Sequence, residues 1–214
     1  MILLFDLDDT LYPEKTYIYQ GFWAVSQFLH AKYGFDLINT YLNLIEIFRK
    51  GSKKIFDDFL GIHKIELQSN YLVRIYREAK RNLFLYNDVP YALNYLKNNN
   101  RLILLTNGDK ETQWKKIKIL DLENYFNDIL VLDDYGKEYW KPSILILNKI
   151  YDRYNHENKF CLIGNAIEDL EFARRAGIDF VFVNRPNNIK KIENTFVERI
   201  IINLQELVEM IERR

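Results

Sequence analysis

Short apolar runs recur along the chain and predict the strands of a sheet. The first run, Ile2–Phe5, is followed at once by acidic residues. The later runs are Leu102–Leu105, Ile129–Leu132, Phe160–Ile163 and Phe180–Val183. A short continuous apolar run bounded by polar residues is typical of a buried strand. The pattern therefore predicts a sheet whose strands lie inside the protein.

Apolar residues at helical spacing fill the segments between most of these runs. Helices are predicted over Asp109–Leu120, Pro142–Tyr154 and Ala166–Ala176. Proline is favoured in the first turn of a helix, so the second of these is predicted to begin at Pro142. Alternating strands and helices are typical of parallel βαβ units, which predicts an α/β fold with a doubly wound parallel sheet. Near the C-terminus, Arg199–Ile202 can add an edge strand, and Asn203–Arg214 is predicted to form a closing helix.

The segment from Pro13 to about Tyr86 has a different pattern. It contains no convincing strand run, whereas apolar residues recur at helical spacing, as in Phe22, Val25 and Leu29. An all-helical block of ~70 residues is too long to be a simple connection between two strands. We therefore predict a helical domain over residues 13–86, inserted into a core formed by residues 1–12 and 87–214.

The charge and composition of the chain limit its possible partners and its location in the cell. The 214 residues carry 30 Lys+Arg and 30 Asp+Glu, so the formal net charge gives no argument for binding nucleic acid or an anionic membrane. No apolar run in the sequence approaches the ~18–20 residues of a membrane span. The single cysteine, Cys161, excludes a disulfide within the chain. We expect a cytoplasmic protein without nucleic-acid or membrane partners.

Three carboxylates follow the first strand run: Asp6, Asp8 and Asp9. In open parallel sheets, ligands bind at the carboxyl ends of the strands. Strand alternation turns Asp6 and Asp8 toward the same side, where two close carboxylates need a cation or a shared proton. Mg2+ suits such a pair, because it is often held by one or two carboxylates and a substrate phosphate. The alternative is an acid cluster that caps the next turn. Asp9 is expected to face away.

The stretch Asp6-Leu7-Asp8-Asp9-Thr10 resembles the first motif, D-x-D-x-T, of the haloacid dehalogenase (HAD) superfamily of phosphohydrolases. The resemblance implies a Rossmann-like core with a cap. It also implies that Asp6 is a nucleophile that becomes an aspartyl-phosphate, and that Asp8 is a general acid and base. Both roles suit a carboxylate. The dehalogenases of the superfamily lack the second aspartate, so Asp8 favours phosphate esters as substrates.

Two further segments resemble the second and third motifs of this superfamily. Leu104–Gly108 follows a strand run and contains Thr106 and Asn107, which the resemblance implies as ligands of the substrate phosphate. Lys141 precedes Pro142 and is implied to neutralise the nucleophile and the phosphoryl oxygens. Taken alone, Thr106 would be a helix cap and Lys141 a solvated lysine. Their order within a pattern of several motifs favours the functional interpretation.

The fourth motif departs from the family pattern. The family commonly has G-D-x-x-x-D, whereas this chain has Gly164-Asn165 and, four residues after Asn165, Asp169. Asn165 stands where the family has a Mg2+-ligating aspartate, and an amide oxygen can coordinate a metal without contributing charge. The metal ligands implied by the resemblance are Asp6, Asp8, Asn165 and Asp169. Glu168 either adds charge to this loop or is an ordinary acid of a helix N-terminus.

Together these motifs imply a Mg2+-dependent phosphomonoester hydrolase acting on a small phosphorylated metabolite, such as a nucleoside monophosphate or a sugar phosphate. The inserted helical domain matches the position of a C1-type cap, as in the phosphoglycolate phosphatase and pyrimidine nucleotidase-like branch. The expected partner is a small-molecule phosphate ester, and the expected state is a monomer or homodimer. Two alternatives remain: a binding or interaction module that has lost activity, which Asn165 suggests, and a phosphotransferase.

Overall fold

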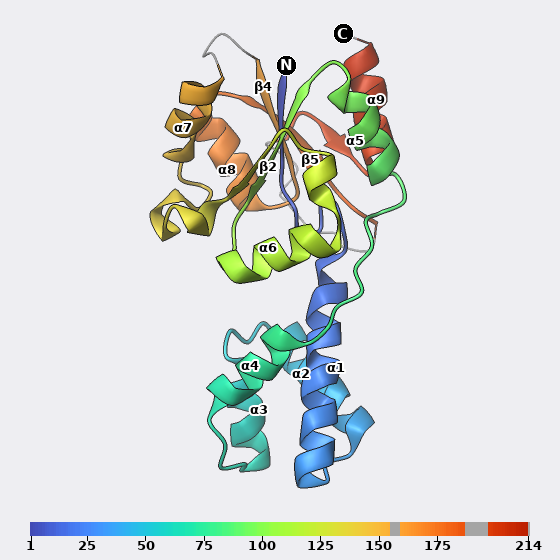
Figure 1. The fold of residues 1–214 in the computed structure, drawn as a ribbon, viewed down its shortest axis with the longest axis vertical. Coiled ribbons are helices and arrows are strands. Elements are labelled where there is room, and N and C mark those ends of the chain that lie inside the picture. The colour runs from blue at the N-terminus through green and yellow to red at the C-terminus, as the bar shows by residue number, and fades with distance from the viewer. Residues whose placement is uncertain (155–158, 187–196, 214) are drawn as a thin grey trace. The chain divides into compact units, whose positions relative to one another are not determined.

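We describe the fold from a computed structural model, which covers residues 1–154, 159–186 and 197–213. The chain divides into two compact units (Figure 1). One, the core unit, comprises Met1–Pro13 with Leu83–Arg214, and the other, the helical unit, is Glu14–Asn82. The helical unit is therefore an insertion between two segments of the core unit.

The core unit contains a parallel sheet of six strands in the order β3-β2-β1-β4-β5-β6. The strands are β1 (Ile2–Phe5), β2 (Arg101–Thr106), β3 (Asp128–Val131), β4 (Phe160–Gly164), β5 (Asp179–Val183) and β6 (Ile200–Ile201). Each apolar run singled out in the sequence forms a strand here. The structure confirms the predicted α/β fold with a parallel sheet, and the edge strand near the C-terminus is the short β6.

Helices cover both faces of this sheet, as expected of a doubly wound fold (Figure 1). The helices of the core unit are α5 (Val89–Lys97), α6 (Lys110–Ile119), α7 (Ile146–Arg153), α8 (Ile167–Ala176) and α9 (Leu204–Glu212). Leu4 of β1 and Leu162 of β4 belong to a buried cluster with Phe172 of α8 and Ile150 of α7. In Figure 1, α5 and α9 lie on the opposite side of the sheet from α7 and α8. The predicted closing helix corresponds to α9, and Arg214 lies outside the described residues.

The register of the central strands brings the predicted motifs to one edge of the sheet. Phe5, the last residue of β1, is aligned with Leu104 of β2 and with Ile163 of β4. Because all three strands are parallel, the residues that follow them emerge side by side at the carboxyl edge. Asp6 and Asn165 therefore belong to neighbouring strand ends.

The predicted start of the helix after Lys141 was wrong. The sequence pattern placed it at Pro142, whereas α7 begins at Ile146. The N–H of Ser143 donates to the carbonyl of Trp140 at 2.9 Å, so a turn encloses Lys141 and Pro142 before the helix starts. Helix α5 was not predicted at all.

The helical unit consists of α1 (Glu14–Tyr33), α2 (Leu37–Arg49), α3 (Ile55–His63) and α4 (Ser69–Glu78). Phe22 of α1 lies at its centre, with the rings of Phe48 and Phe56 at edge-on orientations. Gly21 permits the close approach of α4, because a Cβ atom there would lie 2.3 Å from the ring of Tyr76. In the described ranges of the chain, no helix is both long and apolar enough to cross a membrane.

We predict that Phe172→Ala lowers the free energy of unfolding of the core unit by about 3–5 kcal/mol, because it leaves a cavity beneath the sheet. Phe172 is 0% exposed. Ile167→Ala on the same helix provides the control, since Ile167 is 48% exposed and its loss should cost no more than about 0.5 kcal/mol. Urea unfolding followed by circular dichroism measures both changes. Equal losses for the two variants would show that this face of α8 is not packed as described.

Candidate active site

The loop after β1 is folded tightly against the end of the sheet. The N–H of Asp6 donates to the carbonyl of Ile163 at 2.9 Å, which continues the alignment of β1 with β4. The carbonyl of Leu7 accepts the N–H of Leu11 at 3.0 Å, and Asp9 adopts a left-handed backbone with φ +58. Aspartate tolerates this conformation better than most residues. The turn fixes the backbone that bears Asp6 and Asp8.

Lys141 is the centre of a buried group of charges. Its Nζ lies 2.6 Å from Asp6 Oδ1, 2.7 Å from Asp169 Oδ1 and 2.9 Å from the carbonyl oxygen of Leu105. The contacts with Asp6 and Leu105 are hydrogen bonds, and the contact with Asp169 is an ion pair. Burial alone would lower the pKa of Lys141, but the carboxylates of Asp169 and Asp6 raise it above its usual value. Lys141 is therefore a permanent positive charge inside the protein.

Asp6 is buried and depends on this cation for its own charge. Burial raises the pKa of the Asp6 carboxyl above its usual value, and the ammonium of Lys141 opposes that rise. The hydroxyl of Thr10 donates to the second carboxylate oxygen, Oδ2, at 3.3 Å. A carboxylate with little hydration and one cationic partner is suited to nucleophilic attack.

Asn107 holds the backbone of Lys141 in place. Its side-chain Oδ1 accepts the N–H of Lys141 at 2.8 Å, and its Nδ2 donates to the carbonyl of Lys141 at 3.0 Å. The sequence implied that Asn107 binds the substrate phosphate. In the structure its side chain joins the loop after β2 to Lys141, and the role of Asn107 in phosphate binding stays a prediction.

Asp169 organises the loop after β4. Its Oδ2 accepts the N–H groups of Asn165 at 3.1 Å and Ala166 at 3.0 Å, while its Oδ1 contacts Lys141. A Cβ atom at Gly164 would lie 2.4 Å from Asp169 Oδ2, so glycine is needed for this close approach. The carboxylate that the resemblance implied as a metal ligand therefore anchors Lys141 and the loop.

Asp8 has a separate set of partners, most of them on α6. Tyr12 Oη and Lys116 Nζ donate to Asp8 Oδ1 at 2.6 and 2.7 Å. Gln113 Nε2 donates to Asp8 Oδ2 at 2.9 Å and also to Thr106 Oγ1 at 2.6 Å. The side chains of Asp8 and Thr106, from two different strand ends, are thus joined through one helix.

Sequence reasoning missed Gln113 and Lys116. A signal was present, because the two residues are three positions apart and therefore share one face of α6. Both are nevertheless buried, at 1% and 4% exposure. Buried polar side chains on a helix that follows a motif indicate hydrogen-bonding partners in the interior. Burial itself was not evident from the sequence.

The residues at the strand ends include oxygen ligands of the kind that Mg2+ takes, with one carboxylate and one neutral amide. Within the described residues, no group of three or more His, Cys, Asp and Glu is arranged to hold a metal ion. Asp6 and Asn165 are buried at adjacent strand ends and offer a carboxylate and an amide oxygen. Mg2+ commonly takes one or two carboxylates and completes its shell with water and substrate oxygens. The carboxylate of Asp8 accepts from Gln113 and Lys116, and that of Asp169 contacts Lys141.

Arg185 ties the loop after β1 to more distant parts of the core unit. Its Nη1 donates to both carboxylate oxygens of Asp88 at 2.9 and 2.8 Å, and its Nε and Nη2 donate to the carbonyl of Thr10 at 3.2 and 2.8 Å. The guanidinium lies 4.2 Å from the ring centre of Tyr86. Burial, together with the charge of Asp9, raises the pKa of Tyr86 to about 12. The charge of Asp9 therefore contributes to the raised pKa of Tyr86. Arg185, which belongs to none of the sequence motifs, restrains the loop after β1 through the carbonyl of Thr10.

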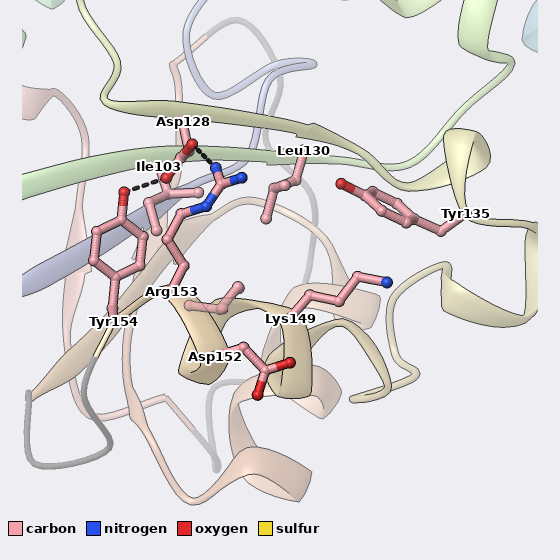
Figure 2. A pocket seen from close by; sticks show the side chains of 9 residues that line it. Ile103, Asp128, Leu130, Tyr135, Lys149, Asp152, Arg153 and Tyr154 are labelled. Atoms are coloured by element: carbon pink, nitrogen blue, oxygen red, sulfur yellow. Dashed lines mark hydrogen bonds and ion pairs between the residues drawn. The ribbon is translucent and has the colours of Figure 1, made fainter.

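A pocket of about 520 Å³ lies elsewhere on the core unit, between α7 and the strands β2 and β3 (Figure 2). Asp128 interacts there with Arg153 and Tyr154, and Lys149 Nζ lies 5.3 Å from the ring centre of Tyr135. The pocket is lined by two acidic and two basic side chains, so its formal charges cancel. None of Asp6, Asp8, Lys141 and Asp169 lines it. The candidate active site is therefore the cluster around Lys141.

A family model for haloacid dehalogenase-like hydrolases matches residues 3–183. The chain belongs to this family. It is 22% identical to N-acylneuraminate-9-phosphatase of Mus musculus, over 98% of this chain and 93% of that protein. It is 24% identical to glyceraldehyde 3-phosphate phosphatase of Pyrococcus furiosus, over 99% and 93% of the two chains.

Solved structures show the same fold. YfnB of Bacillus subtilis, solved with bound magnesium, has a TM-score of 0.72 to this chain, at 22% identity over 98% of this chain and 97% of that one. The predicted family is confirmed, and the protein is an enzyme of the hydrolase class.

We predict that Arg185→Met destabilises the core unit by about 3–5 kcal/mol, because it removes a buried guanidinium and leaves the partly buried carboxylate of Asp88 and the carbonyl of Thr10 without their donor. Arg175→Met serves as the control. The ion pair of Arg175 with Glu171 is solvent-exposed, so its loss should cost no more than about 1 kcal/mol. Urea denaturation measures both values. A loss below 1 kcal/mol for Arg185→Met would refute this role for Arg185.

Proposed function

We propose that the protein is a phosphomonoester hydrolase that acts on small phosphorylated metabolites through an aspartyl-phosphate on Asp6. The observation that carries this proposal is the buried pair of Asp6 and Lys141 at the carboxyl end of β1. A buried cation beside a carboxylate favours the ionised form of the nucleophile against the rise in pKa that burial causes, and it offers positive charge to an incoming phosphoryl group. The names of two relatives in the same family, both phosphatases, support this reaction class.

In the first proposed step, an oxygen of Asp6 attacks phosphorus and forms an aspartyl-phosphate while the ester P–O bond breaks. The departing alkoxide takes a proton from the carboxyl group of Asp8. In the second step, water attacks the phosphorus and gives its proton to Asp8. The bond between Asp6 and phosphorus then breaks, which releases orthophosphate and regenerates the carboxylate.

Other residues of the cluster bind the phosphoryl group or hold its ligands. Lys141 offsets negative charge next to Asp6, and the Thr106 hydroxyl is available at the neighbouring strand end. Asn107 and Asp169 keep Lys141 in place through its backbone and its ammonium group. Asp6 and Asn165 would hold Mg2+, which when bound neutralises charge on the phosphoryl oxygens.

We further propose that the helical unit acts as a cap and determines which ester is accepted. The relatives include N-acylneuraminate-9-phosphatase and glyceraldehyde 3-phosphate phosphatase, which favours a phosphorylated sugar or sugar acid over a nucleotide. A panel of phosphorylated metabolites tests this choice. Turnover confined to nucleoside monophosphates would contradict it.

We predict that Asp6→Asn lowers kcat for p-nitrophenyl phosphate by at least about a thousandfold, because the amide cannot form the aspartyl-phosphate. Steady-state kinetics with millimolar Mg2+ measure the change. Asp152→Asn is the matched control, because Asp152 lines the separate pocket of Figure 2 and should leave kcat unchanged. Full activity of Asp6→Asn would exclude the covalent mechanism. Absence of turnover by the unaltered protein would favour the alternative of a binding module.

We also predict that Asn165→Asp lowers the Mg2+ concentration needed for half-maximal activity by about tenfold, since it adds a negative charge beside the cation. A Mg2+ titration of activity measures this value. Asn124→Asp, on the surface of the core unit, controls for the added charge alone. An unchanged or higher requirement in Asn165→Asp would show that this residue does not face the metal.

A further inference from the structure

We infer that Gln113 is a positioning residue of the proposed reaction, which aligns Asp8 and Thr106 through a single amide group. The inference rests on the proposed function and extends it to α6. Gln113 lies within the first turns of that helix and is 1% exposed. A buried amide that served packing alone could be replaced by an apolar side chain, so its hydrogen bonds decide its role.

The orientation of the amide follows from its neighbours. Gln113 Nε2 is 2.9 Å from Asp8 Oδ2 and 2.6 Å from Thr106 Oγ1. The NH2 group of Gln113, and not its carbonyl oxygen, therefore faces both Asp8 and Thr106. The two N–H bonds of one nitrogen are then used for two different residues. The hydrogen bond to Asp8 therefore also fixes the N–H group that Thr106 Oγ1 accepts.

The hydroxyl of Thr106 becomes a directed donor as a result. Its oxygen accepts from Gln113, so its own hydrogen must point toward another acceptor. In the structure that acceptor is the carbonyl of Asn107, at 3.2 Å, which is a long and weak hydrogen bond. A phosphoryl oxygen is a stronger acceptor and can replace it. Gln113 thus prepares Thr106 to donate to substrate.

Asp8 is held from two sides. Gln113 fixes its Oδ2, while Tyr12 and Lys116 fix its Oδ1. Without Gln113, the carboxyl group could rotate about its last bond, and the oxygen that meets the leaving group would lose its position. General acid catalysis requires this geometry within hydrogen-bonding distance.

The loop after β2 is shaped to leave room for the amide. Gly108 has φ +123, and a Cβ atom there would lie 3.0 Å from Gln113 Cδ. Only glycine adopts this backbone readily while leaving that space. The glycine of the second motif therefore accommodates Gln113 in addition to ending the strand loop.

The test compares two esters that differ in their need for an acid. p-Nitrophenolate is a stable leaving group and needs little protonation, whereas the alkoxide of glycerol 2-phosphate must be protonated. kcat/KM reports the steps up to formation of the aspartyl-phosphate. For Gln113→Met, we expect kcat/KM for glycerol 2-phosphate to fall about tenfold to a hundredfold more than kcat/KM for p-nitrophenyl phosphate.

Two further variants sharpen the result. Gln113→Glu keeps the shape of the side chain but presents acceptors to Asp8 and Thr106, so it should shift the ratio of the two esters in the same direction. Lys118→Met, at an exposed position of the same helix, should leave the ratio unchanged. Thermal unfolding of each variant verifies that the proteins are folded.

A purely structural role predicts a different outcome. If Gln113→Met and Gln113→Glu lower kcat/KM equally for both esters, or not at all, the inference is overturned. Failure of both variants to fold would also overturn it, because Gln113 would then be a residue of the core alone. Absence of turnover by the unaltered protein would reject the proposed function together with this inference, whereas an unchanged ratio rejects the inference only.

Discussion

The buried ammonium of Lys141 is the interaction on which the rest of the site depends. It forms ion pairs with Asp6 and Asp169 in the interior and donates a hydrogen bond to the carbonyl of Leu105. Removing one partner of such a group leaves a charge without compensation, at a cost of about 3–5 kcal/mol. The ends of β1, β2 and β4 are consequently held at one place. The same contact that stabilises the edge of the sheet opposes the rise in the pKa of Asp6 that burial causes.

The sequence was sufficient to predict the parallel sheet and the strands that form it. Apolar runs such as Ile2–Phe5 and Phe160–Ile163 are continuous because both faces of the sheet are covered, and their short length between polar residues favoured strands over helices. The start of α7 could not be predicted, because Pro142 suits a first helical turn and also the turn that surrounds Lys141. α5 was missed, and it begins without a side-chain cap.

The site was less predictable than the fold, for a physical reason. Asp6, Asp8 and Lys141 stand in recognisable motifs, but two partners of Asp8, Gln113 and Lys116, are separated from it by more than a hundred residues of sequence. Hydrogen bonds of that kind exist only once the helix and the strand end have been brought together. The side chains of Asn107 and Asp169 illustrate the same limit. Their motifs suggested contacts with phosphate and metal, whereas in the structure both side chains hold Lys141.

The two chain segments that lead into and out of the helical unit are fastened within the core unit. The N–H of Tyr86 donates to the carbonyl of Leu11 at 3.0 Å. Arg185 donates to the carbonyl of Thr10, and its guanidinium lies over the ring of Tyr86. The two points where the chain leaves and re-enters the core unit are therefore held in a fixed position. An insertion of different length or sequence could replace the helical unit at these points, and the strand ends would keep their geometry. Changes in the length or sequence of the insertion could then accumulate while the ends of β1, β2 and β4 kept their arrangement.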